Sequence, residues 1–290
     1  FTRLVIDGSI AVVVDIVAQL RCSGEHSAVS IIAITGLKGG AGRLFAIPLY
    51  ARAIQAEAIT VLGTLTGKPA IERGKHVIAD KPLALNSADA RTMLAAAEAK
   101  GIVHAVTFNY RYNPLMQQAR VMINRGDIGK THWVHGYYIQ DWLLYPNDYN
   151  WRLEKEGGDS RCVADIGSHW CDLAGYITGS RINEVLAEYT TVFPTRQKPK
   201  GTREAFAQST GQEEFDEYPV DTEDFASVLL RFENGMKGSF SVSQVSAGHK
   251  NGLEIEVDGG KAALAWKQER PNELWIGKRN EPNAWMLKDP

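Results

Sequence analysis

Cysteines and long hydrophobic runs are both scarce in this sequence. Three cysteines, Cys22, Cys162 and Cys171, occur in 290 residues, and their spacing gives no Cys-x-x-Cys pair for a metal or redox site. Because an odd number of cysteines does not suit a disulfide scaffold, we expect a reducing compartment and a cytoplasmic protein. No apolar run approaches the roughly 20 residues that a membrane-spanning helix needs, so no membrane partner is expected.

An excess of basic residues is also missing. The 32 lysines and arginines are balanced by 34 aspartates and glutamates, which gives a formal net charge of −2. Proteins that bind nucleic acids or acidic membranes are usually strongly basic, so neither partner is expected. A hydrophobic content of 44% with 23% charged residues is typical of a soluble globular protein, and the length suits two domains.

The first third of the chain alternates strand and helix patterns. The runs "RLVIDG" and "VSIIAIT" are rich in β-branched residues, as buried strands are, and we expect a helix between them at residues 9–22. The strand "HVIA" follows a helix that ends at Gly74. The stretch "NSADARTMLAAAEAKG" then predicts a helix capped by Asn86 or Ser87, and "IVHAVTFNY" predicts another strand. Such alternation predicts an α/β domain with a Rossmann-type parallel sheet.

The pattern changes after residue 130. Runs such as "THWVHGYYIQDW", "DFASVLLRF" and "MKGSFSVSQVS" predict long strands, and "ENG" and "DGG" are hairpin signals between strands. They predict a second, α+β domain with a large, mostly antiparallel open sheet, and a domain boundary near residue 110. Few helical segments remain to cover this sheet, so one face is expected to meet a second subunit. Residues 195–222 are polar and predict a long loop.

The stretch "HVIADKPLAL", residues 76–85, brings a lysine to the end of an apolar strand. Asp80, Lys81 and Pro82 all favour loops, so an ordinary surface turn is one interpretation. Open α/β sheets bind their ligands at the carboxyl ends of parallel strands, and Lys81 stands at such an end. An active-site lysine is therefore the other interpretation, and the bond before Pro82 is a candidate for a cis peptide.

A second stretch, "GGDSRCVADIGSHWCDLAGYITG", places ionisable residues in an apolar helix. Asp165, His169 and Asp172 follow one another at i, i+4 and i+7, which predicts one shared helix face. A polar network at a domain interface would account for them as well as a catalytic site would. General acid–base catalysis by His169 is the chemical alternative. We expect no metal there, because a second histidine at ligand spacing is missing.

Four motifs together resemble one known family. The stretches "GKHVIADKPLAL", "NYRYNP", "GDIGK" and "DIGSHWCDLA" occur in this order from about residue 70 onward. Their combination is similar to the Gfo/Idh/MocA oxidoreductases, which include glucose-fructose oxidoreductase and inositol dehydrogenase. The resemblance implies hydride transfer between NAD or NADP and a secondary hydroxyl (CH–OH) of a sugar or cyclitol. It also implies a dinucleotide-binding domain at residues 1–110 and a substrate-binding and oligomerisation domain at residues 111–290, in a homodimer or homotetramer.

The resemblance also assigns roles to single residues. Lys81 matches the family's active-site lysine, and Asp165 and His169 match the aspartate and histidine of its second catalytic motif. Oxidation of an alcohol needs a base, for which His169 is suited. Lys81 can bond the developing alkoxide, and Asp165 a neighbouring hydroxyl. The expected substrate-binding residues are Asn109, Tyr110, Tyr112, Trp151, Arg152, Asp165 and His169. For the two tyrosines and the tryptophan, ordinary interface packing is an equal alternative.

The cofactor is expected to meet residues at three places in the first domain. These residues are Gly8, Ala11, Thr35, Lys38, Lys81 and Pro82. The G-x-G-x-x-G fingerprint is only partly present, because "RLVIDGSIA" has Ile6 where the first glycine belongs. At the end of the second strand, Thr35 with Lys38 close behind permits NADP and does not exclude NAD.

The sequence leaves two alternative functions open. The incomplete fingerprint motivates a non-catalytic member of the same fold that senses a dinucleotide or a sugar. The acidic and histidine side chains of the second stretch motivate a metal-dependent sugar isomerase or hydrolase that uses Asp165, His169 and Asp172. The latter would require a bound metal ion.

Overall fold

The computed structural model of this chain describes residues 5–6, 9–10, 12–13, 32–33, 58–61, 64–84, 86–154, 158–200 and 214–289. The chain divides into two units, Phe1–Thr107 and Phe108–Pro290. Each unit has its own sheets and its own apolar core.

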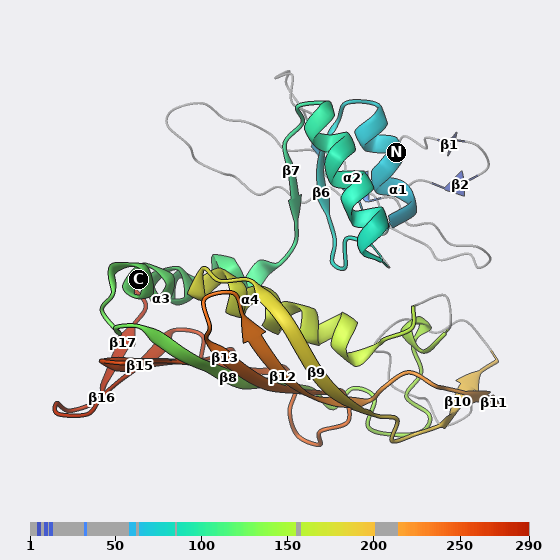
Figure 1. Cartoon of the computed structure of the whole chain (residues 1–290). Coiled ribbons are helices and arrows are strands. Elements are labelled where there is room, and N and C mark those ends of the chain that lie inside the picture. The colour runs from blue at the N-terminus through green and yellow to red at the C-terminus, as the bar shows by residue number, and fades with distance from the viewer. Residues whose placement is uncertain are drawn as a thin grey trace. The chain divides into compact units, whose positions relative to one another are not determined.

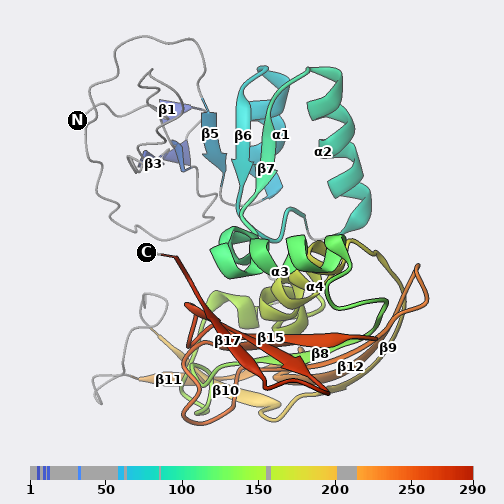
Figure 2. The same ribbon diagram turned by 90° about the vertical axis from the view of Figure 1, so that its left-hand side faces the viewer.

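The first unit contains short strands, a parallel sheet and two helices. Its elements are β1 Val5–Ile6, β2 Ser9–Ile10, β3 Val12–Val13, β4 Ile32–Ala33, β5 Ala58–Val61, α1 Thr64–Glu72, β6 His76–Ala79, α2 Ser87–Ala99 and β7 His104–Val106. Strand β6 lies between β5 and β7 and pairs with both in parallel. Figures 1 and 2 show these strands side by side with α1 and α2 packed beside them. The predicted parallel α/β arrangement is thereby confirmed for this part of the chain.

Local sequence signals explain where these elements begin and end. Val77 and Ala79 are the buried positions of β6. They share one apolar cluster with buried residues of α1 and α2. The Asn86 side chain accepts a hydrogen bond of 2.9 Å from the Asp89 N–H and so caps α2, as predicted. Gly74, beyond the end of α1, has φ 69°, a left-handed conformation that glycine adopts without strain.

The expected helix at residues 9–22 is wrong for the residues that the structure describes there. These residues form β2 and β3, which pair antiparallel with β1 and β4. The sequence around them, "IAVVV", is rich in β-branched residues, which lose side-chain freedom in a helix and favour extended backbone.

The second unit is dominated by one large sheet. Its helical elements are η1 Asn109–Tyr112, α3 Pro114–Arg125, η2 Trp151–Leu153, η4 Val163–Gly167 and α4 Ser168–Thr178. Its strands are β8 Thr131–Ile139, β9 Ile182–Thr190, β10 Thr195–Pro199, β11 Phe215–Pro219, β12 Phe225–Phe232, β13 Lys237–Ser243, β14 Gly252–Gly259, β15 Ala262–Lys267, β16 Glu273–Lys278 and β17 Ala284–Leu287. Eight of them form a sheet in the order β17-β16-β15-β14-β8-β13-β12-β9. All its pairs are antiparallel except β8 with β13, which confirms the predicted mostly antiparallel sheet.

Helices α3 and α4 cover one face of this sheet (Figure 1). Alternate residues of β12 are buried, as period-2 side-chain geometry requires when one face is covered. Trp170 of α4 is fully buried, donates its indole N–H to the Glu254 carbonyl at 3.0 Å and stacks on Phe240 at 4.5 Å. Gly136 of β8 permits this close approach, because a Cβ at that position would lie 2.0 Å from the Glu254 carbonyl oxygen. In the described part of the chain, no helix covers the opposite face, which we call the open face.

The predicted loop at residues 195–222 is wrong in part. Strands β10 and β11 pair antiparallel within it and form a two-stranded ribbon. Arg196 of β10 is fully buried and binds Asp224 and backbone carbonyls, so a strand of polar sequence is held by an ionic contact rather than by apolar packing.

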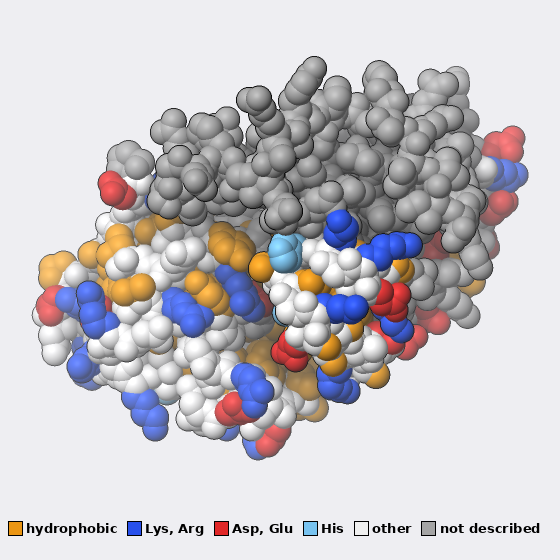
Figure 3. All heavy atoms as spheres, turned by 90° about the horizontal axis from the view of Figure 1, so that it is seen from above, with side chains coloured by type: hydrophobic (Ala, Val, Ile, Leu, Met, Phe, Trp, Pro, Cys, Tyr) orange, Lys and Arg blue, Asp and Glu red, His pale blue; other side chains and the backbone are white. Residues whose placement is uncertain are grey.

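The described surface carries charges of both signs. On the face shown in Figure 3, lysine and arginine side chains lie intermixed with aspartate and glutamate. None of the described helices combines the length and the apolar character needed to cross a bilayer.

Candidate active site

Lys81 follows the carboxyl end of β6, the middle strand of the parallel sheet β5–β6–β7, as the sequence predicted. The Asp80 carboxylate accepts hydrogen bonds from the Lys81 N–H at 2.9 Å and from the Thr107 hydroxyl at 2.7 Å. Thr107 follows β7, so Asp80 ties together the ends of two neighbouring strands. The Lys81–Pro82 peptide bond is cis, as proposed from the sequence. The lysine therefore stands on a braced turn at the sheet edge where open α/β folds bind ligands.

Asp165 and His169 lie on consecutive helical segments of the second unit. Asp165 belongs to the π-helical segment η4, and His169 belongs to α4, which continues it directly. A π-helical turn is wider than an α-helical one and is frequent at functional sites. It alters the expected i, i+4, i+7 spacing, so the three ionisable residues do not present one regular α-helical face.

Aromatic rings surround His169. Its imidazole is 9% exposed and makes edge-on contacts with Tyr110, Phe108 and Tyr138 at centroid distances of 5.2, 5.6 and 6.3 Å. The two tyrosine hydroxyls lie 2.8 Å apart, and Tyr138 donates to the Asn251 side-chain oxygen at 2.6 Å. Burial, with the Tyr110 hydroxyl and the Asp165 charge, raises the pKa of Tyr138 far above its ordinary value. Tyr138 therefore stays a neutral hydrogen-bond donor among the rings around His169.

The Asp165 carboxylate has one hydrogen-bonded oxygen and one ion-paired oxygen. Gln244 donates its side-chain amide to Oδ2 at 2.9 Å, and the Arg152 Nε lies 3.3 Å from Oδ1. The Gln244 amide orientation is itself fixed, because its Oε1 accepts from Arg161 Nη1 at 3.0 Å. Its NH2 group must therefore face Asp165. A carboxylate bound in this way acts as an acceptor and a fixed negative charge.

A buried ionic cluster stands behind Gln244. Asp224 pairs with Arg161 at 2.5 Å and with Arg196 at 2.7 Å, and all three side chains are fully buried. Burial alone would raise the pKa of Asp224, but the charges and hydrogen bonds of the two arginines outweigh burial and lower it. We call Arg161, Arg196, Asp224 and Gln244 the Asp224 cluster.

The neighbouring acid holds the helix that carries the candidate catalytic residues. Glu223 accepts backbone N–H groups of Arg161, at 3.0 and 3.1 Å, and of Val163, at 2.8 Å. A carboxylate at a helix N-terminus satisfies free N–H groups and complements the helix dipole. Glu223 thus fixes the start of η4. Asp224 acts through Arg161 to fix the Gln244 side chain that contacts Asp165.

Asp172 has a different role from Asp165 and His169. Its carboxylate forms a bidentate pair with Arg111, with an Nε–Oδ2 distance of 2.6 Å. Arg111 belongs to η1, so this pair ties η1 to α4. Asp165, His169 and Asp172 do not form a group with metal-ligand geometry; among the described residues only His135, Glu256 and Asp258 do.

The remaining expected site residues fall into two groups. Asn109 opens η1, Tyr112 is exposed, and Arg152 lies over the exposed ring of Trp151 at 4.6 Å. The expected cofactor residues Gly8, Ala11, Thr35 and Lys38 lie outside the described residues. Sequence reasoning missed Gln244, Arg161, Glu223, Asp224, Tyr138 and Asn251. The acid pair in "DTEDF", directly before a strand, was the one local signal for them.

The two described cysteines do not suit thiol chemistry. Burial, with the Asp172 charge, raises the pKa of Cys171 to about 12, and burial raises the pKa of Cys162 as well. A thiol that stays protonated is a poor nucleophile.

Comparison with known proteins gives the family. Residues 116–265 match the GFO/IDH/MocA C-terminal domain, and residues 59–108 match the oxidoreductase family NAD-binding Rossmann fold. Levoglucosan dehydrogenase of Pseudarthrobacter phenanthrenivorans is 35% identical over 210 residues, which cover 71% of this chain and 53% of that protein.

Solved structures agree with this assignment. A levoglucosan dehydrogenase in complex with NADH and L-sorbose is 28% identical, with a TM-score of 0.70 over 80% of this chain and 60% of that one. An inositol dehydrogenase homolog of Azotobacter vinelandii in complex with NADH and myo-inositol is 27% identical, with a TM-score of 0.66 over 79% of this chain and 55% of that one.

The C-terminal domain match covers more than half of the chain, and the chain belongs to the GFO/IDH/MocA oxidoreductase family. The chain spans about half the length of the curated relatives it matches.

Proposed function

We propose that this chain is an NAD(P)-dependent dehydrogenase that transfers a hydride between its cofactor and a secondary hydroxyl of a sugar or cyclitol. The observation that supports the proposal most is the pair Asp165 and His169. The carboxylate is held by a hydrogen bond from Gln244 and an ion pair with Arg152. The imidazole lies on the next helical segment and is enclosed by aromatic rings. Relatives in the same family are sugar and inositol dehydrogenases by name.

The proposed catalytic residues divide the work between them. His169 accepts the hydroxyl proton, for which imidazole is suited near neutral pH. Asp165, which Gln244 and Arg152 hold in place, binds a neighbouring substrate hydroxyl. Lys81 donates a hydrogen bond to the oxygen that becomes charged. Asn109, Tyr110, Tyr112, Trp151 and Arg152 are the proposed substrate contacts around them.

A nicotinamide cofactor is proposed for the first unit. The described residues fit it in one respect, because β5, β6 and β7 are parallel neighbours in chain order. The last three strands of the Rossmann order 3-2-1-4-5-6 have the same arrangement. Lys81 and Pro82, at the carboxyl end of β6, would contact the cofactor, and Gly8, Ala11, Thr35 and Lys38 are the further candidates. Hydride acceptance is the chemistry that such a cofactor supplies when bound.

Assembly and location are part of the proposal. We propose that residues 1–110 bind the dinucleotide and that residues 111–290 bind substrate and join subunits through the open face of the sheet. A homodimer or homotetramer would cover the exposed Leu186 and Leu229, which stand opposite each other on β9 and β12. A cytoplasmic location is supported by the odd number of cysteines.

One experiment tests this proposal against its alternative. Sugars and inositols are screened with NAD and with NADP, and reduced nicotinamide is followed by its absorbance. Turnover with at least one polyol is expected, and Lys81→Met should lower turnover by about 10²- to 10³-fold, with a much smaller effect on cofactor binding. Cofactor binding by fluorescence titration without turnover on any polyol would favour the sensing alternative, which the incomplete fingerprint at Ile6 and Gly8 motivates. Absence of cofactor binding would overturn both the dehydrogenase and the dinucleotide sensor and would leave a sugar-binding protein.

A further inference from the structure

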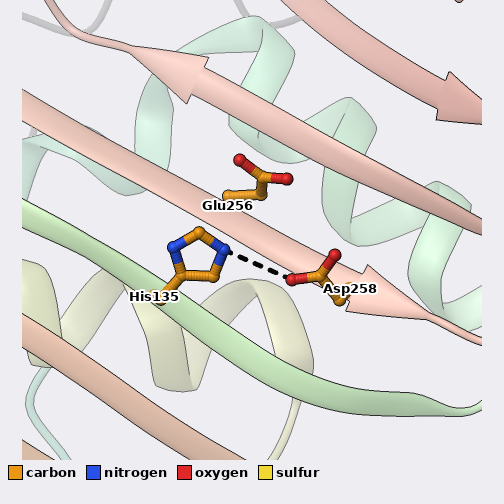
Figure 4. A group of neighbouring side chains, drawn as sticks. All are labelled: His135, Glu256 and Asp258. Atoms are coloured by element: carbon orange, nitrogen blue, oxygen red, sulfur yellow. Dashed lines mark ion pairs between the residues drawn. The ribbon is translucent and has the colours of Figure 1, made fainter.

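Three potential metal ligands lie side by side on the open face of the large sheet. His135 of β8 stands directly opposite Glu256 of β14, and Asp258 follows two residues further along β14. Alternate residues of a strand point to the same face, so both carboxylates leave the sheet on the side of the imidazole (Figure 4). We propose that His135, Glu256 and Asp258 bind a divalent transition-metal ion, with zinc the best match, at a site separate from the proposed active site.

The separations suit a zinc ion. Zinc binds imidazole nitrogen and carboxylate oxygen at about 2.0–2.1 Å in a tetrahedron, which places neighbouring ligand atoms about 3.3 Å apart. The distance from His135 Nε2 to Asp258 Oδ2 is 3.3 Å. The Glu256 oxygen completes a group whose ligand atoms all lie within 4.8 Å of one another. Glutamate has an unbranched, rotatable side chain, so small torsional changes can bring this oxygen to the same separation.

One ligand atom lacks a hydrogen-bond donor although it is buried. Among the described residues, Asp258 Oδ2 and Arg196 Nε are the buried side-chain polar atoms without a hydrogen-bond partner. A buried carboxylate oxygen without a hydrogen bond costs free energy, and a bound cation removes this cost. Asp258 Oδ2 lies 3.3 Å from His135 Nε2 in an ion pair but accepts no hydrogen bond, so a cation between the two atoms would bind both.

The local charges also favour a cation. Glu254, the next acid on this face of β14, is already bound by Lys267 at 2.7 Å and by the Tyr137 hydroxyl at 2.8 Å. In the described part of the chain, Asp258 has an ion pair only with His135, and Glu256 has no ion pair. Two carboxylates thus share one imidazole.

The ligand types identify the kind of metal. Calcium and magnesium prefer oxygen ligands alone, whereas imidazole with carboxylates suits zinc and its neighbours in the first transition row. Three protein ligands leave a fourth tetrahedral position for water. The Trp133 ring stacks on His135 with a centroid distance of 3.8 Å and holds the imidazole in place.

The competing explanation is an ion pair between protonated His135 and Asp258 without a metal. Equilibrium dialysis of the full chain with zinc, after treatment with a chelator, separates the two. We expect one zinc per chain. Asp258→Asn and His135→Gln should each weaken binding by about 100-fold or more, since even loss of an outer contact to a metal ligand costs 10- to 100-fold. His132→Gln, an exposed histidine on the same strand, is the matched control and should bind as the parent does.

Cobalt provides a second measurement that does not depend on affinity. Co²⁺ in the site should show the intense visible absorption of tetrahedral coordination, and Glu256→Gln should abolish it. Circular dichroism checks that the variants fold, which is expected because the three side chains are only half-buried. A parent chain that binds no zinc at micromolar concentration would overturn the proposal. Zinc retained equally by Asp258→Asn, His135→Gln and the control would overturn it as well.

Discussion

Two charged clusters of the second unit differ in how well their members are paired. In the Asp224 cluster, the buried carboxylate pairs with two arginines. One of them, Arg161, orients the Gln244 amide, which donates a hydrogen bond to Asp165. In the open-face cluster of His135, Glu256 and Asp258, one imidazole lies beside two carboxylates, and the buried Asp258 Oδ2 accepts no hydrogen bond. A carboxylate paired with two arginines holds its neighbours in place, although Arg196 Nε has no hydrogen-bond partner. An excess of carboxylates over cations instead favours the binding of a further cation. Substitutions should therefore affect stability and catalysis at the first and ligand binding at the second.

The largest effect is expected at the proposed general base, His169. His169→Asn should lower turnover by about 10²- to 10⁴-fold, the usual contribution of a general base, and should leave cofactor binding intact. The acidic limb of the pH profile should disappear, because the group whose deprotonation it reports is gone. His104→Asn, an exposed histidine of β7, is the control. An unchanged pH profile would move the base elsewhere, with Lys81 the next candidate.

Asp224→Asn should cost about 3–5 kcal/mol in the free energy of unfolding, because it leaves two buried arginines without their carboxylate. The pKa of Asp224 is lower in the folded chain than in the unfolded one. Its stabilisation is therefore complete above the ordinary aspartate pKa, near 4, and is lost as pH falls through the folded value. Urea unfolding from pH 3 to 7 measures this, with the exposed Asp159→Asn as control. Equal losses of unfolding free energy in Asp224→Asn and Asp159→Asn would mean that the buried ion pairs of Asp224 contribute no particular stability.

Gln244→Glu tests whether the cluster positions Asp165. The new carboxylate can still accept from Arg161, but it faces the Asp165 carboxylate where an amide donated before. Loss of a hydrogen bond to a charged group costs about 1.5–3 kcal/mol, so turnover should fall by about 10- to 100-fold. The pH profile should gain a new limb, because two facing carboxylates titrate as a pair. Lower stability with an unchanged profile would mean that Gln244 serves the fold alone.

Local signals predicted the parts of the fold that depend on neighbours in sequence. The Asn86 cap, the end of α1 at Gly74 and the position of Lys81 after "HVIA" are each determined within a few residues. The alternation of buried and exposed residues likewise predicted the antiparallel strands. The π-helical turn at Asp165 and the partner Gln244 were not predictable, because these residues meet across a sequence separation of 79. Such contacts leave no periodic pattern in the chain.

A substitution on the open face is expected to weaken subunit association rather than to lower the stability of the folded chain. Leu186 and Leu229 line a hollow of about 520 Å³ on this face, together with Ser227, Ser239 and Ser241. Leu229→Glu should weaken subunit association at least about tenfold, since covering a leucine contributes about 1.5–3 kcal/mol. Sedimentation velocity over a range of protein concentrations measures this. Leu94→Glu, an exposed leucine of α2, is the control. A parent chain that is monomeric at micromolar concentration would count against the proposed interface.

The smallest effect is expected at an exposed ion pair on the open face. Arg231 of β12 and Glu184 of β9 pair at 2.9 Å, and both side chains are about 60% exposed. Exposed pairs contribute about 0.2–1 kcal/mol, because water screens the charges and ordering two long side chains costs entropy. Arg231→Ala should therefore change the free energy of unfolding within this range, and less at high salt. The measurement is urea unfolding at two protein concentrations. A cost that rises above about 2 kcal/mol only at the higher concentration would mean that the pair is desolvated in a subunit contact. The open face would then contain a buried ion pair in the assembled protein, as the Asp224 cluster does. The two regions would differ in charge pairing only in the isolated subunit.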